Sequence, residues 1–139
     1  MINRVLDLQT LTVGRVMAPL AKVVSVTSQT PVSEVLKLCR EHGVTRLPVW
    51  QAEGASQRVA GILNLRSLLY EARPEANQTA GDYLKPALFL DEGRRLEDAM
   101  RQLQRGGQRL AIVLDRDRKE IGVLSLQDIL KVVFGEFRL

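Results

Sequence analysis

Ser125 and Asp128 lie three residues apart at the predicted start of the last helix, and both carry oxygen atoms that can cap a helix or accept a hydrogen bond. A helix N-terminus presents unpaired N–H groups and the positive end of the helix dipole, so it suits an anion. The Asp128 carboxylate could accept hydrogens from two hydroxyl groups at once. It could instead cap the backbone amides at the start of its own helix. The sequence leaves both interpretations of Asp128 open.

The charge of the chain favours an anionic partner. The formal net charge is +4, which suits nucleotide phosphate, nucleic acid or lipid head groups. The basic residues are spread along the chain, and aromatic residues make up only 4% of it, so a surface that stacks RNA bases is not expected. We therefore predict a specific phosphate pocket and no nucleic-acid partner.

The remaining reactive side chains do not indicate catalysis. Cys39 is the single cysteine and lies on the apolar stripe of a predicted helix, which favours a small core residue over a nucleophile. His42, the single histidine, has no partner at metal-ligand spacing. The sequence contains neither a Ser/His/Asp or Cys/His set nor a glycine-rich phosphate loop. We predict no metal site and no enzymatic activity for this chain.

The elements that must position Ser125 and Asp128 occur twice. Residues 61–69 (GILNLRSLL) match residues 122–130 (GVLSLQDIL) at an offset of 61. The apolar positions of an upstream helix recur at an offset of 64: Val32, Val35, Leu36 and Cys39 match Leu96, Ala99, Met100 and Leu103. Residues 44–49 (VTRLPV) match residues 107–112 (GQRLAI), an alignment that makes Arg46 and Arg109 equivalent.

Each copy is predicted to run β-α-β-β-α. The first copy has its elements at 23–26, 31–42, 46–50, 58–63 and 65–72, with a loop around 51–58. The second has them at 87–90, 96–104, 110–114, 121–125 and 126–134. A period near sixty is too long for a helical solenoid. We predict an α/β fold (α+β in some schemes) of two repeats packed with pseudo-twofold symmetry around a ligand-binding cleft.

The size and composition fit one soluble domain. The chain has 139 residues, of which 45% are apolar, as in ordinary globular proteins. No apolar run approaches the roughly twenty residues that a transmembrane helix needs, and the N-terminus lacks the apolar core of a signal peptide. We expect the chain to be soluble in a reducing compartment.

A duplicated β-α-β-β-α unit that ends in Gly-apolar-apolar-Ser/Asn-x-x-Asp/Ser resembles the CBS domain, which occurs in pairs called Bateman modules. The resemblance places the repeats at 16–69 and 83–136, with an N-terminal segment at 1–15 and a linker at 70–82. Residues 122–130 carry the strongest single match.

Residues 5–8, 12–19 and 128–136 are similar to the CorC-type, hemolysin-like proteins related to the CNNM metal transporters. Those proteins place a CBS pair in the cytosol between a transmembrane domain and a small C-terminal domain. The resemblance implies an excised regulatory module on the cytoplasmic side of the inner membrane, with that transmembrane domain as a partner. Leu20 and residues 116–118 depart from the family, which has an arginine and an acidic-Tyr-Gly turn there.

The resemblance implies a site for ATP, ADP or AMP. In the family, the residue at Asp128 holds the ribose hydroxyls, that at Ser125 faces phosphate, and that at Val123 borders adenine. Mg²⁺ would enter bound to the phosphates rather than in a protein cage.

The first repeat completes the implied site. Ser25, Val44 and Thr45 would supply backbone and apolar contacts to the base. Arg46 and Arg109 are the candidates to neutralise the phosphates, and the alternative for each is a solvated surface charge.

A pseudo-symmetric second pocket would have Ser67 at the position of Asp128 and Asn64 at that of Ser125. Because neither offers a bidentate acceptor, we predict one nucleotide site rather than two. The implied function is regulation of a Mg²⁺/Co²⁺ transport or efflux protein by an adenosine nucleotide. The alternative is a structural or dimerisation module with a ligand-free pocket. With either function we expect a homodimer, for which exposed apolar helices such as those at 68–69 and 132–133 would provide the contact.

Overall fold

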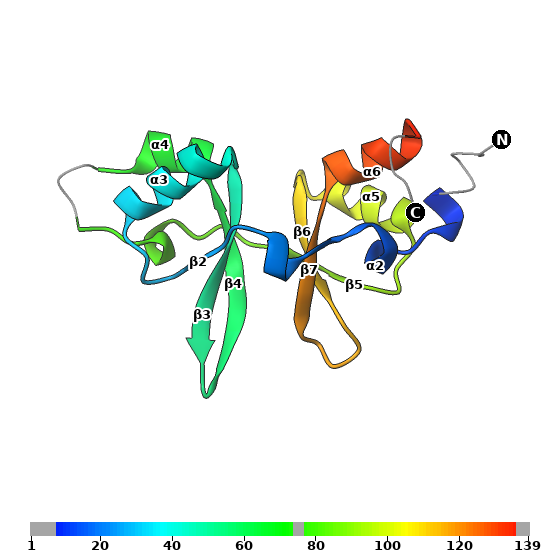
Figure 1. The fold of residues 1–139 in the computed structure, drawn as a ribbon, viewed down its shortest axis with the longest axis horizontal. Coiled ribbons are helices and arrows are strands. Elements are labelled where there is room, and N and C mark those ends of the chain that lie inside the picture. The colour runs from blue at the N-terminus through cyan, green and yellow to red at the C-terminus, as the bar shows by residue number, and fades with distance from the viewer. Residues whose placement is uncertain (1–7, 74–76, 136–139) are drawn as a thin grey trace. The chain divides into compact units, whose positions relative to one another are not determined.

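A computed structural model describes residues 8–73 and 77–135, which form two compact units (Figure 1). The central unit is residues 24–87, and the terminal unit combines the chain before residue 24 with the chain after residue 87. The first seven residues of the predicted N-terminal segment, residues 74–76 of the predicted linker and Glu136 lie outside the described residues. Each unit contains one β-α-β-β-α repeat, as predicted.

The central unit has a three-stranded sheet with strand order β2-β3-β4 among the described residues. Its elements are β2 (Val26–Thr27), α3 (Val32–His42), β3 (Arg46–Glu53), β4 (Ser56–Asn64), α4 (Leu65–Glu71) and the short 3-10 helix η2 (Ala80–Tyr83). β2 runs parallel to β3, and β4 runs antiparallel to it. The first strand is shorter and later than the predicted 23–26 because pairing with β3 begins only at Val26, opposite Val49.

Helix α3 forms because its apolar residues recur at helical spacing, and it ends at Gly43, whose φ of 63° is left-handed. Val35 and Cys39 on its inner face are buried, which confirms Cys39 as a core residue. The core also contains Leu47, Leu63 and other side chains of β3, β4 and α4. Burial raises the pKa of the Cys39 thiol, which disfavours the reactive thiolate.

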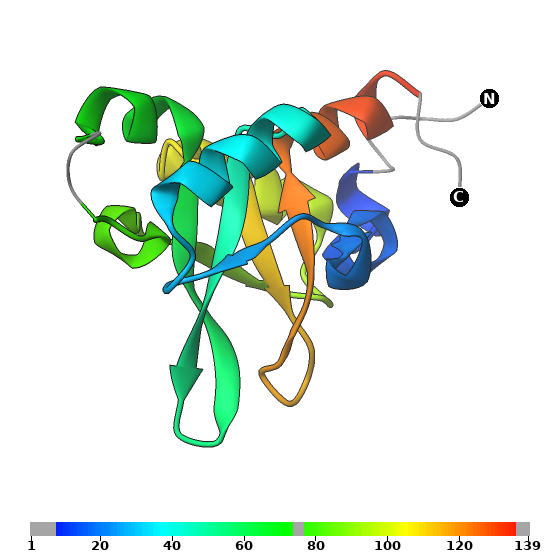
Figure 2. The ribbon, with the colours of Figure 1, turned by 60° about the vertical axis from the view of Figure 1, so that its left-hand side comes forward.

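The expected loop at 51–58 is instead the end of a long hairpin. Strand pairing continues from Gln51↔Arg58 to Glu53↔Ser56, and a two-residue turn that contains left-handed Gly54 closes it. The prediction was wrong because polarity was taken to mark a loop, whereas backbone pairing needs no apolar side chains. Figures 1 and 2 show the hairpin tip pointing away from α3 and α4.

The terminal unit has a four-stranded sheet with order β1-β7-β6-β5 in the part of the chain that the structure describes. Its elements are α2 (Val13–Val16), β1 (Ala18–Pro19), the 3-10 helix η1 (Leu20–Lys22), β5 (Leu88–Asp91), α5 (Leu96–Arg105), β6 (Leu110–Leu114), β7 (Glu120–Ser125) and α6 (Leu126–Val133). α5 and α6 bury Leu103 and Ile129 with Leu124 of β7 in one core.

Two leading segments, residues 12–19 (TVGRVMAP) and 79–86 (TAGDYLKP), match each other at an offset of 67 and extend the repeat beyond the predicted alignment. Each lies at the start of one repeat in the sequence but packs with the sheet of the other repeat. In the terminal unit, Ala18 pairs with Val123. In the central unit, Lys85 bridges Ile62, the residue equivalent to Val123. The repeats therefore exchange their leading segments.

Candidate functional site

Ser125 and Asp128 form a reciprocal capping box at the start of α6. The Asp128 N–H donates to Ser125 Oγ at 3.0 Å, and the Ser125 N–H donates to Asp128 Oδ2 at 3.2 Å. Both residues are half-buried. Asp128 Oδ1 has no hydrogen-bond partner among the described residues. Asp128 thus caps its helix and retains one carboxylate oxygen that can accept a hydrogen bond from a ligand.

Strand β7 fixes the direction of these two side chains. Val123 is 6% exposed and lies between Ile112 of β6 and Ala18 of β1 in the sheet. Since successive strand residues face opposite sides, Val123 lies on the side away from core residue Leu124. The structure therefore brings Val123, Ser125 and Asp128 together within one unit.

The remaining predicted contacts belong to the central unit, apart from Arg109. Ser25 precedes β2, and its Oγ accepts a hydrogen bond from Trp50 Nε1 at 3.2 Å. Val44, half-buried, packs against the core of the unit. The Thr45 carbonyl accepts from the Leu65 N–H at 2.8 Å, which fixes residues 44–46 beside the start of α4. Arg46 Nη1 lies 3.4 Å from Thr45 Oγ1.

The predicted equivalence of Arg46 and Arg109 is wrong. The Arg109 carbonyl accepts from the Leu126 N–H at 2.9 Å, which is the bond that Thr45 makes with Leu65. Likewise Leu110 pairs with Ser125, as Arg46 pairs with Asn64. Arg109 is therefore the counterpart of Thr45.

The physical reason for this shift lies at the helix ends. Gly43 and Gly107 are both left-handed, with φ of 63° and 64°, so the helix-to-strand turns correspond at an offset of 64. Aligning arginine with arginine required an offset one residue shorter. Arg109 is nevertheless exposed and adjoins the start of α6 through its carbonyl. Its backbone therefore lies beside the start of α6.

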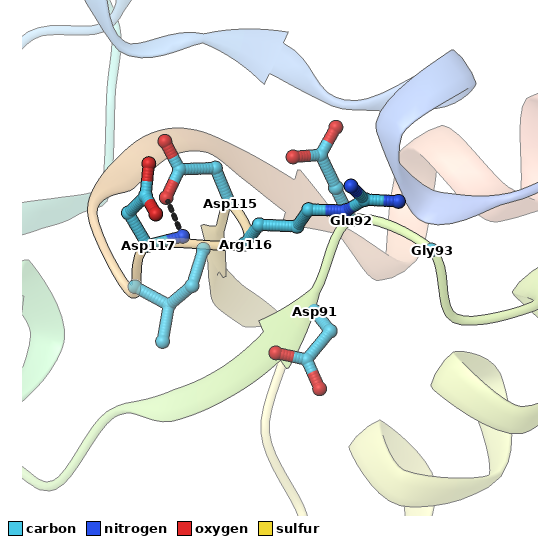
Figure 3. A pocket seen from close by; sticks show the side chains of 7 residues that line it. Asp91, Glu92, Gly93, Asp115, Arg116 and Asp117 are labelled. Atoms are coloured by element: carbon cyan, nitrogen blue, oxygen red, sulfur yellow. Dashed lines mark hydrogen bonds between the residues drawn. The ribbon is translucent and has the colours of Figure 1, made fainter.

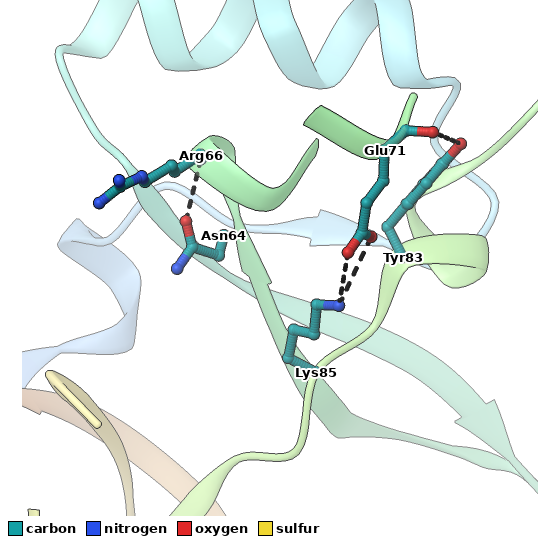
Figure 4. Close-up of polar contacts among 5 residues, drawn as sticks. All are labelled: Asn64, Arg66, Glu71, Tyr83 and Lys85. Atoms are coloured by element: carbon teal, nitrogen blue, oxygen red, sulfur yellow. Dashed lines mark hydrogen bonds and ion pairs between the residues drawn. The ribbon is translucent and has the colours of Figure 1, made fainter. Parts of the chain in front are cut away.

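The corresponding positions of the central unit are built differently. At the start of α4, Asn64 Oδ1 accepts from the Arg66 N–H at 2.9 Å, and no reciprocal bond from a carboxylate is available because residue 67 is serine (Figure 4). Nearby, Lys85 Nζ pairs with Glu71 Oε1 at 3.2 Å. The Tyr83 hydroxyl has two acceptors within hydrogen-bonding distance, Gln78 Oε1 and, at 3.4 Å, the Glu71 carbonyl. These contacts fasten the leading segment 79–86 to the end of α4.

A pocket of about 530 Å³ lies in the terminal unit, away from the predicted site residues. Figure 3 shows its lining: Asp91, Glu92, Gly93, Asp115, Arg116 and Asp117. Asp115 Oδ1 accepts from the backbone N–H groups of Asp117 and Lys119, so this carboxylate shapes the β6–β7 turn. No group of three or more His, Cys, Asp or Glu side chains within residues 8–73 and 77–135 is arranged to hold a metal ion.

Comparison with known proteins identifies the repeats. The CBS domain profile matches residues 13–73 and 80–135. The magnesium and cobalt efflux protein CorC of Salmonella typhimurium is 25% identical over 137 residues, which cover 98% of this chain and 46% of that protein. The UPF0053 protein YhdP of Bacillus subtilis is 21% identical over 99% of this chain and 31% of that protein. The chain spans less than half the length of either relative.

Solved structures share the fold. The ATP complex of the CBS domain of the bacterial CNNM/CorC family Mg²⁺ transporter superposes with a TM-score of 0.86 at 24% identity, covering 96% of this chain and 94% of that one. The AMP complex of CBSX2 superposes with a TM-score of 0.74 at 27% identity, covering 92% and 99%. The α+β fold of two repeats is thereby confirmed. Among the helices that the structure describes, none is long and apolar enough to cross a membrane.

Proposed function

Because this chain belongs to the CBS domain family as a tandem pair related to CorC and UPF0053 proteins, we propose that it binds one adenosine nucleotide and regulates the protein that contains it. The observation that carries the proposal is the Ser125–Asp128 capping box with an unpartnered Asp128 Oδ1. An acceptor beside a helix N-terminus offers one group for the ribose hydroxyls and another for phosphate.

Each predicted residue has a chemical role in the proposed complex. Asp128 accepts hydrogen bonds from the ribose, Ser125 and the first amides of α6 face a phosphate, and Val123 offers apolar surface to the base. Ser25, Val44 and Thr45 are the residues we propose for contact with the base, and Arg46 is proposed to add positive charge. Arg109, whose carbonyl accepts from the first amide of α6, is proposed to direct its guanidinium group toward the phosphates. ATP, ADP and AMP share the ribose and base that these residues would contact.

The proposed role of the complex is regulation of ion movement. The relative CorC is named a magnesium and cobalt efflux protein. We propose that this chain lies on the cytoplasmic side of the membrane, next to the transport domain of its parent protein. Nucleotide binding changes transport only if two states of the parent bind the nucleotide unequally. Mg²⁺ would accompany the phosphates of ATP or ADP.

A second candidate function is that of a dimerisation module. The predicted exposure of residues 68–69 and 132–133 is wrong for Leu68 and Val132, which face the core of their units and are buried. Other large apolar side chains of α4 and at α6 are exposed: Leu69 at 65%, Tyr70 at 81%, Leu130 at 40% and Phe134 at 67%. Exposed apolar surface of this kind favours association, and a second copy of the chain is the partner we propose. Sedimentation of wild type beside the double variant Tyr70→Lys/Phe134→Lys tests this role. A wild type that sediments as a monomer at all concentrations contradicts it.

Nucleotide binding is tested by calorimetric titration and thermal melts with ATP, ADP and AMP, each with and without Mg²⁺. A nucleotide at a hundred times its Kd should stabilise the fold by about 2.7 kcal/mol. Asp128→Ala removes the helix cap together with the ribose acceptor, whereas Asp128→Asn keeps an oxygen for the Ser125 N–H and loses the second acceptor. Comparing these two variants separates capping from binding.

We expect Asp128→Asn to melt near wild type and to lose nucleotide affinity. Ser67→Ala, the matched change in the first repeat, should leave affinity unchanged. Equal losses in the Asp128 and Ser67 variants would contradict a single site. No binding of any nucleotide by wild type would leave dimerisation as the better-supported function.

A further inference from the structure

The single tryptophan of the chain makes a side-chain hydrogen bond within the predicted base-contacting region. Trp50 Nε1 donates to Ser25 Oγ at 3.2 Å, and this bond is partly buried. Trp50 stands in β3 opposite Thr27 of β2, so it lies diagonally across the strand pair from Ser25. Its carbonyl also accepts from the Ser28 N–H at 2.8 Å. Backbone and side chain together therefore fix Trp50 against the residues that surround β2.

This hydrogen bond is a property of the first repeat. Strand register matches Trp50 with Leu114 and Ser25 with Phe89, because Asp91↔Leu114 in the terminal unit corresponds to Thr27↔Trp50. Neither Leu114 nor Phe89 has a side-chain hydrogen-bonding group. The bond thus occurs in the repeat that also contains residues 44–46. Because the second repeat has the same fold without this bond, the fold alone does not require it.

The direction of the bond sets what Ser25 can offer. An indole N–H only donates, whereas a serine hydroxyl has one hydrogen and two lone pairs. With one lone pair occupied by Trp50, the hydroxyl hydrogen must point away from the indole. Ser25 Oγ has no other hydrogen-bond partner in the part of the chain that the structure describes, so that hydrogen is available to an acceptor.

We propose that Trp50 is a positioning residue that presents the Ser25 hydroxyl as a hydrogen-bond donor to N1 of adenine. The inference rests on the proposed nucleotide function. A hydroxyl that donates at this place favours adenine over hypoxanthine or guanine, because N1 of adenine accepts its hydrogen whereas N1 of the other two bases carries a hydrogen and can meet Ser25 Oγ only through the lone pair that Trp50 leaves open. A site that hydrogen-bonds its ligand rejects an analogue that lacks the matching group.

The test measures the affinities of ATP and of inosine triphosphate (ITP) by calorimetry in wild type, Ser25→Ala, Trp50→Phe and the double variant. Trp50→Phe keeps an aromatic ring and removes the N–H. Tyr83→Phe is the matched control, since it removes an aromatic donor from the same unit, where Tyr83 bonds to the Glu71 carbonyl. Thermal melts of all variants confirm that they fold.

We expect wild type to prefer ATP and each single variant to lose about fivefold in ATP affinity with little change for ITP, as for one hydrogen bond between neutral groups. The double variant should bind ATP no worse than Ser25→Ala, because Trp50 acts through Ser25. Three results would overturn the inference about Trp50 but leave the proposed function standing. They are an unchanged ratio of ATP to ITP affinity in Trp50→Phe, losses of ATP affinity that add up in the double variant, and an equal change of the affinity ratio in Tyr83→Phe. No ATP binding by wild type would overturn the proposed function with it.

Discussion

Gly61 and Gly122 are equivalent residues at which each sheet receives the leading segment of the other repeat. A Cβ at residue 122 would lie 2.7 Å from the Ala18 carbonyl oxygen and 2.6 Å from Met17 Sδ. A Cβ at residue 61 would lie 2.5 Å from the Lys85 carbonyl oxygen. A side-chain sulfur can move aside, but a backbone oxygen moves only with its strand. Alanine at either position must therefore push the leading segment off the sheet.

The cost of this substitution follows from two opposing effects. Forcing an extra carbon into a packed interior costs about 1–3 kcal/mol. Replacing glycine with alanine restricts the unfolded chain and returns about 0.4–1 kcal/mol. The net loss is about 1–2 kcal/mol for Gly122→Ala and for Gly61→Ala. For a chain of this size the melting temperature should fall by roughly 5 °C.

Gly93→Ala provides the matched control, because a Cβ at Gly93 would meet no atom within 4 Å and its φ lies outside the left-handed region. At Gly93 the alanine only lowers the conformational entropy of the unfolded chain, so this variant should melt at or slightly above the wild-type temperature. Thermal melts of the three variants, followed by circular dichroism, measure these differences in melting temperature. If Gly122→Ala melts as Gly93→Ala does, the leading segment is not held against β7 as described.

Three further predictions concern other parts of the chain. Arg118 has a left-handed φ of 64°, and its ion pair with Asp91 is exposed, so Arg118→Gly should raise the free energy of unfolding by roughly 0.5–1 kcal/mol in urea titrations. Burial raises the pKa of the Cys39 thiol, so the folded state favours the protonated thiol. The resulting contribution to the free energy of unfolding should be present below the unfolded pKa and lost as pH rises through the folded pKa. In urea titrations above and below pH 9, Cys39→Ala should remove this loss of stability at high pH. A fragment of residues 24–87 contains the leading segment 79–86 that packs on its own sheet, whereas a fragment of residues 12–73 lacks it. The first fragment should therefore unfold more cooperatively than the second when unfolding is followed by circular dichroism.

The duplicated fold could be predicted from sequence because the two repeats carry the same apolar spacing. The offset of 61 over residues 61–69 and 122–130 corresponds to identical pairing of β4 and β7 with their neighbours. The capping box at Ser125 was equally predictable, since serine followed by an acidic residue three positions on is a helix-start signal. Sequence patterns that depend on spacing within a single helix or strand, such as apolar periodicity and helix caps, therefore predict the structure correctly.

Register across the helix-to-strand turn could not be predicted in the same way. Aligning Arg46 with Arg109 pairs two identical residues at an offset of 63. The left-handed glycines at 43 and 107 instead align the two turns at an offset of 64, one residue away from the arginine alignment. Side-chain identity at an exposed position has little energetic weight, whereas a glycine that must adopt positive φ is costly to replace. The glycines were therefore the better anchors for the alignment.

The exchange of leading segments shows why a sequence repeat need not be a folding unit. Residues 12–19 align with residues 79–86, yet the hydrogen bonds of Gly14 and Gly81 run to Glu92 and Ser28, each in the other repeat. An alignment records which residues share an ancestor's pattern, and it cannot record which strand edge each segment covers. The Ser125–Asp128 capping box consequently depends on residues more than 100 positions away in the chain, because β1 covers the edge of β7, the strand that ends in Ser125. A substitution in residues 17–19 that shifts β1 should therefore be assessed for its effect on nucleotide binding as well as on stability, although none of these residues is near Asp128 in the sequence.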